Sequence, residues 1–91
     1  MSDRELPLDE LLEFPCSFTF RVVAVDQPGL ADHCQQAVER ALGRQAGCVT
    51  HQPSRSGRYG TVRVEATVHQ ADEITRAYGA LRSVDGLKML L

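Results

Sequence analysis

The sequence has no long apolar run and little net charge, and each shortage excludes a class of protein. No stretch approaches the roughly 20 apolar residues that a membrane-spanning helix requires. The formal net charge of −2 and the pI near 5.8 give no general attraction to nucleic acid or to anionic membranes. We therefore expect a soluble protein without general affinity for polyanions.

Cysteine is also scarce. The three cysteines, Cys16, Cys34 and Cys48, leave one unpaired under any intramolecular scheme. No basic, apolar N-terminal segment resembles a secretory signal. Reduced thiols and a cytoplasmic location are therefore expected.

Potential metal ligands occur together only as His33-Cys34 and Cys48-x-x-His51. A closed zinc site needs four converging ligands, and a second pair of the CxxC type is missing. Cys34 falls on the apolar stripe of a predicted helix, and nothing indicates that a histidine activates a cysteine. Since no Ser-His-Asp arrangement, paired acids or phosphate loop can be argued, we expect no enzyme activity, metal or cofactor.

The length of 91 residues suits one domain, and 43% apolar residues are enough for a single two-layer core. Residues 1–13 are rich in acids around a few leucines. We expect them to form a loose, flexible segment before a folded domain at 14–91.

Alternating apolar and polar residues predict four strands. The alternation is clear at 59–69 and at 16–25, and two of the three phenylalanines fall on the inner face of the 16–25 strand, which indicates a central position. Residues 48–52 favour a short strand that forms a hairpin with 59–69, and Pro53 favours an edge position for it. The last strand is expected at 87–91.

Two helices are predicted from apolar residues three or four positions apart. The first helix is expected to begin at Pro28, which would occupy its first turn, and to end at Gly43 or Gly47. The second helix is expected to cover 71–83. The order βαββαβ predicts an α+β, two-layer ferredoxin-like plait, with a four-stranded antiparallel sheet of order 4-1-3-2 and both helices on one face. The helix-free face would carry Thr19, Arg21, Arg63, Glu65, Thr67 and Lys88.

The candidate binding site is the turn Asp26-Gln27-Pro28-Gly29-Leu30, between the first strand and the first helix. Gly29 allows close approach to the backbone. The free amides and positive dipole end of a helix favour a carboxylate or phosphate, while Asp26 suits an amine. The alternative is purely structural, because Asp, Pro and Gly are common turn residues and an acid at a helix start usually caps its own backbone.

This turn resembles the Asp-x-Pro-Gly-Leu turn of ACT domains, regulatory modules that commonly bind amino acids there. The resemblance implies ligand roles for Asp26, Pro28, Gly29 and Leu30. ACT modules usually act fused to an enzyme or a transporter regulator and often bind their effector between two modules, whereas this chain is a lone module. A homo-oligomer, or a separate enzyme as target, is therefore expected.

Four further segments are distinctive: residues 11–22 (LLEFPCSFTFRV), 52–59 (QPSRSGRY), 78–81 (YGAL) and 87–91 (LKMLL). Together they resemble the YbeD-like family of small bacterial proteins. That family has no characterised function, and its fold is described as similar to the regulatory ACT-like domain of phosphoglycerate dehydrogenase. The resemblance thus implies an ACT-like fold and supplies no catalytic residues.

The polar turn between the second and third strands carries Arg55 and Arg58. We expect them at a hairpin tip that either grips a phosphate or an acidic protein partner or is simply solvated. An RNA-binding protein that uses the sheet and this tip is the alternative, because RNA-recognition motifs share this order of strands and helices. Tyr59 fits the third-strand pattern of that motif, but Thr61 and Val64 stand at its later aromatic positions.

Together these features predict a non-enzymatic regulatory or adaptor protein. It is expected to bind a small carboxylate-bearing, amino-acid-like metabolite at Asp26 to Leu30, a protein partner, or both. A membrane is not an expected partner, and nucleic acid remains only as the alternative.

Overall fold

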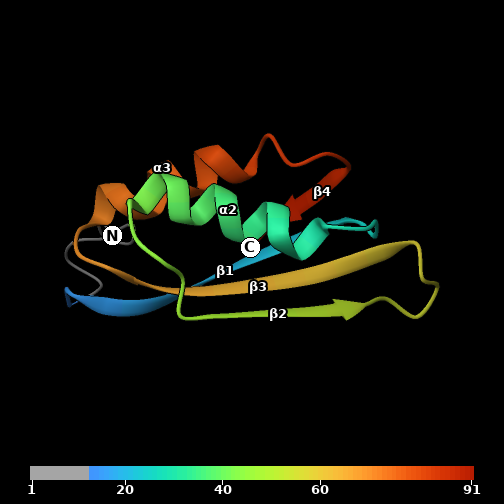
Figure 1. Ribbon diagram of the computed structural model, residues 1–91, viewed down its shortest axis with the longest axis horizontal. Coiled ribbons are helices and arrows are strands. Elements are labelled where there is room, and N and C mark those ends of the chain that lie inside the picture. The colour runs from blue at the N-terminus through green and yellow to red at the C-terminus, as the bar shows by residue number, and fades with distance from the viewer. Residues whose placement is uncertain (1–12) are drawn as a thin grey trace, which may run out of the picture.

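The structure, a computed structural model, describes residues 13–91, so all of the predicted segment 1–13 except its last residue lies outside the described part. The elements follow the order βαββαβ (Figure 1). They are β1 (Cys16–Val25), α2 (Leu30–Leu42), β2 (Cys48–Pro53), β3 (Tyr59–Val68), α3 (Ala71–Leu81) and β4 (Leu87–Leu90). All six predicted elements are present, and their ends differ from the prediction by no more than two residues.

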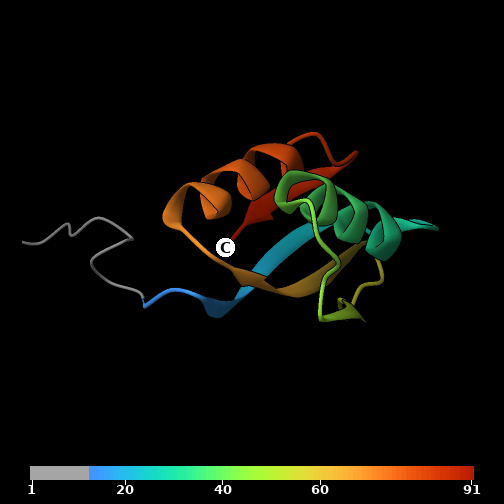
Figure 2. The same ribbon diagram turned by 60° about the vertical axis from the view of Figure 1, so that its left-hand side comes forward.

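The four strands form one antiparallel sheet of order β2-β3-β1-β4. Both helices lie on the same face of this sheet (Figure 1, Figure 2). β1 is central between β3 and β4, and β2 is an edge strand, as Pro53 predicts. The predicted strand order and the ferredoxin-like fold class are therefore confirmed.

The alternation of β1 and β3 decides which face of the sheet is buried. Phe20 and Val22 lie opposite Val64 and Val62, and all four side chains are fully buried. The helices complete the core with Leu30, Cys34, Val38, Ile74, Ala77 and Leu81. Fully burying one large apolar side chain contributes about 1.5–3 kcal/mol. The six polar residues predicted on the helix-free face are all exposed there.

The first helix differs from its prediction at its start. α2 begins at Leu30, with Gly29 as its N-terminal cap, so Pro28 lies before the helix and not in its first turn. Gly29 has a left-handed backbone with φ +80°, which separates Pro28 from the helix. Gly43, not Gly47, ends the helix. Its N–H donates to the Glu39 carbonyl, and its own backbone is left-handed with φ +73°.

Other ends shift by one or two residues. α3 ends at Leu81, not at 83, because the Ser83 N–H turns back to the Ala80 carbonyl and tightens the last turn. β3 ends at Val68 because the next amide, that of His69, donates to a side chain in α3. Within residues 13–91, neither helix has the length and apolar character needed to cross a membrane.

Candidate functional site

The predicted turn is held at the end of the sheet by backbone hydrogen bonds from both sides. The Val25 N–H donates to the Gly86 carbonyl, and the Asp26 N–H donates to the Arg58 carbonyl, each at 2.9 Å. Arg58 follows the hairpin tip, whereas Gly86 precedes β4. The turn therefore has a defined position between two segments that are distant in sequence.

Asp26 does not cap the helix that follows it. Its Oδ1 accepts a hydrogen bond from His51 Nε2 of β2 at 2.9 Å. Gly60 of β3 makes room for this pair, because a Cβ at that position would lie 2.8 Å from His51 Nε2 and 3.2 Å from Asp26 Oδ1. The carboxylate is thus held beneath the turn by the strand pair β2–β3.

The Gln27 side chain also makes its hydrogen bonds away from α2. Its Nε2 donates to the Asp85 carbonyl at 2.8 Å and to the Val25 carbonyl at 3.2 Å. The side chain therefore ties the turn to the segment between α3 and β4. The Gln27 carbonyl accepts from the Leu30 N–H at 3.2 Å, but neither the Asp26 nor the Gln27 side chain accepts from an amide of α2.

The start of α2 is consequently open. Gly29 supplies no capping side chain, and a Cβ placed on it would meet no described atom within 4 Å. Among residues 13–91, no side chain accepts a hydrogen bond from the amides of Ala31 or Asp32. Free N–H groups and the positive end of the helix dipole therefore face open space beside Gly29.

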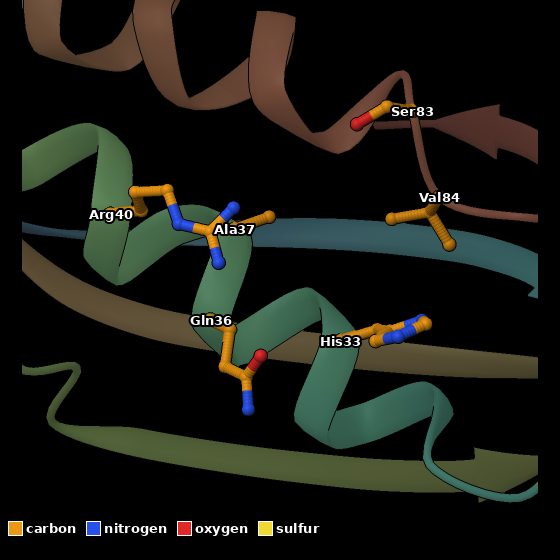
Figure 3. A pocket seen from close by; sticks show the side chains of 6 residues that line it. All are labelled: His33, Gln36, Ala37, Arg40, Ser83 and Val84. Carbon is orange, nitrogen blue, oxygen red and sulfur yellow. The ribbon is translucent and has the colours of Figure 1, made fainter.

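A small groove begins one helical turn farther along. It lies between α2 and the segment after α3, has a volume of about 210 Å³, and is lined by His33, Gln36, Ala37, Arg40, Ser83 and Val84 (Figure 3). The His33 N–H donates to the Gly29 carbonyl at 2.9 Å, so the groove continues the helix that starts at the turn.

The hairpin tip places Arg55 and Arg58 in solvent. Its serines form the local hydrogen bonds: Ser54 Oγ and Ser56 Oγ lie 3.2 Å apart, and Ser56 Oγ accepts from the Arg58 N–H at 3.2 Å. Only the backbone of Arg58 meets the turn. The structure thus brings the two predicted sites together through the main chain, while both guanidinium groups stay exposed.

The aromatic rings of β1 lie on the helix side of the sheet. Phe20 packs edge-on against Tyr78 of α3 with 5.2 Å between ring centroids, and Phe18 lies 6.3 Å from the same ring. These rings belong to the packing between sheet and helix. The orientation predicted for both phenylalanines is confirmed.

Residues 9–91 match a family model described as a protein of unknown function (DUF493). The chain belongs to the DUF493 family. UPF0250 proteins of Yersinia pestis (strain Pestoides F) and Yersinia pseudotuberculosis (serotype O:3, strain YPIII) are each 38% identical over 85 residues, which is 92% of this chain and 95% of the relative. The YbeD-like resemblance is confirmed by these matches.

Solved structures share the fold of this DUF493 protein. The solution structure of protein HP0495 from H. pylori has a TM-score of 0.74 at 15% identity, and 98% of each chain is covered. The ACT domain from GTP pyrophosphokinase of Chlorobium tepidum has a TM-score of 0.67 at 16% identity, covering 85% of this chain and 96% of that domain. At such identities the likeness establishes an ACT-like fold alone.

Sequence reasoning about the DUF493 chain did not place His51, Gly60 or Asp85 at the turn. His51 was considered only as a metal ligand or an activator of cysteine. The sequence does indicate the side on which His51 lies. Side chains two residues apart on a strand share a face, so His51 lies on the helix side together with Val49. In residues 13–91, no three His, Cys, Asp or Glu side chains are grouped so that they would hold a metal ion.

We expect the thiols of this DUF493 protein to react at very different rates. Cys48 is exposed, whereas Cys34 is buried in the core. Burial raises the pKa of the Cys34 thiol from 9.0 to about 11, which lowers its thiolate fraction about 100-fold. Labelling with a disulfide reagent at pH 8 should therefore modify Cys48 first and Cys34 only after urea is added. Loss of the fast phase in Cys48→Ser is the control, and equal rates for both thiols in the native protein would contradict the packing.

Proposed function

We propose that this DUF493 protein is a non-enzymatic regulatory or adaptor module that binds a small carboxylate-bearing metabolite at residues 26–30. The observation that carries the proposal is the open start of α2: the side chains of Asp26 and Gln27 are bonded elsewhere and leave the amides of Ala31 and Asp32 available. The metabolite's carboxylate would accept hydrogen bonds from these amides.

An amino-acid-like ligand fits this arrangement best. The Asp26 Oδ1 atom is taken by His51, but among the described residues Oδ2 has no partner, so it is free to accept from an ammonium group. The helix dipole contributes only about 0.3–1 kcal/mol to holding an anion. Charge-assisted hydrogen bonds, at about 1.5–3 kcal/mol each, must therefore supply most of the affinity.

The ACT-like fold supports a regulatory role, because the sequence of residues 26–30 resembles the turn at which ACT domains commonly bind amino acids. In our proposal the module acts in the cytoplasm as a homo-oligomer or on a separate protein target. Arg55 and Arg58 at the tip are the side chains proposed for that protein partner, because both are exposed and the Arg58 carbonyl accepts a hydrogen bond from Asp26 of the turn.

Thermal denaturation with a panel of amino acids and small organic acids tests the site. A ligand present at ten times its Kd stabilises the folded state by about 1.4 kcal/mol and should raise Tm by about 5–10 °C for a domain of this size. Gly29→Asn should weaken that shift, because asparagine tolerates a positive φ and fills the space beside the amides. Asp26→Asn should weaken the shift for amino acids more than for simple carboxylates.

Asp72→Asn is the matched control, since Asp72 is an exposed acid in the first turn of the other helix. It should leave every ligand shift unchanged. A ligand that stabilises Gly29→Asn and Asp26→Asn as much as the wild type would remove the turn from the mechanism. The absence of any shift across the panel would contradict metabolite binding and favour a protein partner.

A further inference from the structure

We propose that the groove between α2 and the segment after α3 is a second, separate site, which binds the phosphate group of a small molecule through His33, Gln36 and Arg40. This site does not depend on the turn at 26–30. The groove has a volume of about 210 Å³. Pockets that enclose drug-sized ligands are larger, at about 300–1,000 Å³. The groove therefore has room for a compact group and not for a whole cofactor.

Three hydrogen-bond donors line one wall. His33, Gln36 and Arg40 stand three and four residues apart, so successive turns of α2 carry them on the same side of the helix (Figure 3). Ser83 and Val84 form the opposite wall, beyond the end of α3. An occupant would thus lie between a wall of donors and a mostly neutral one.

These donors are free to bind a ligand. Among residues 13–91, the side chains of His33, Gln36 and Arg40 have no hydrogen-bond or ion-pair partner. Glu39, the acid next to Arg40 in sequence, makes its hydrogen bonds elsewhere. It accepts from the Gln35 side chain at 3.0 Å and from the Ala46 N–H at 2.8 Å. Among residues 13–91, Arg40 therefore forms no ion pair with this neighbour.

The donor set matches a phosphate better than a carboxylate. A guanidinium group can donate two parallel hydrogen bonds to an oxyanion, and near pH 7 a phosphate monoester carries a charge of about −1.5 to −2, against −1 for one carboxylate. A phosphate monoester has a third free oxygen, which can accept from the imidazole of His33 or the amide of Gln36. Ala37 and the small exposed part of Val84 form the apolar part of the lining, against which the carbon skeleton attached to the phosphate can lie.

Amide chemical-shift titrations at constant ionic strength test the proposal with inorganic phosphate, glycerol phosphate and succinate as probes. Saturable shifts are expected at residues 33–40 and 83–84 with both phosphates, and at least tenfold weaker binding with succinate. Arg40→Gln should weaken phosphate binding at least tenfold. Arg76→Gln, which removes an exposed arginine from α3, should leave it unchanged.

Tighter binding of glycerol phosphate than of inorganic phosphate would assign the site to a phosphorylated metabolite, and the reverse order to free phosphate. Equal weakening by both arginine variants would reduce the effect to general charge attraction and overturn the proposal, as would an unsaturable response. Gly29→Asn separates the two sites: unchanged phosphate binding in that variant places the ion in the groove, while its loss places the ion at the turn.

Discussion

Phe20→Ala is expected to lower the free energy of unfolding by about 3–5 kcal/mol, the range for deleting a fully buried phenylalanine side chain. Phe20 is 0% exposed, lies at the centre of the sheet, and contacts Phe18 and Tyr78 with ring centroids 4.9 and 5.2 Å away. A domain of this length has about 5–14 kcal/mol of total stability. The substitution should therefore remove about a fifth of it or more.

Urea denaturation measures this loss as a lower midpoint at nearly unchanged slope. Phe18→Ala is the matched control, because Phe18 is on the same strand and face but only half-buried. Its loss should be clearly smaller, and Phe20→Leu should recover part of the stability by refilling the cavity. Equal losses for the two alanine variants would contradict the packing of β1 beneath the helices.

Glu73→Gln is expected to destabilise the fold by about 2 kcal/mol at neutral pH, the scale of losing charge-assisted hydrogen bonds at a buried group. Glu73 is only 5% exposed. Its two oxygens accept from Arg44 at 3.0 and 2.9 Å, and Oε1 also accepts from the His69 N–H at 2.8 Å. This carboxylate joins the loop after α2 to the start of α3. Chemical denaturation of both proteins at pH 7 measures the difference.

The same residue predicts a dependence on pH. The hydrogen bonds from Arg44 and, second, from the His69 amide lower the pKa of Glu73 to about 2 from its ordinary 4.5. The unfolded state therefore binds a proton at higher pH than the folded state, so this contribution is complete above about pH 4.5 and is lost as pH falls toward 2. Wild type and Glu73→Gln should differ most above pH 5 and converge near pH 2. A difference that stays constant from pH 7 to pH 2 would show that Glu73 is not ionised and paired as described.

The candidate site could be predicted only in part. The turn at 26–30 was identified because strand and helix periodicities meet there, and both periodicities are local. The partner of Asp26 was not, because His51 is 25 residues away and reaches it only through the register of β2 on β3. Without that partner, a sequence reader expects the acid to cap its own helix, which it does not.

By itself, the sequence determined the order of strands and helices, the buried face of β1 and the edge position of β2. These follow from side-chain alternation and from Pro53, which act over a few residues. The tertiary structure alone decided that Asp26 and Gln27 turn away from α2, and that Arg40 stands opposite Ser83 across a groove. Such contacts join segments 25 to 58 residues apart, and only the register of the strands and the packing of the helices on the sheet bring those segments side by side.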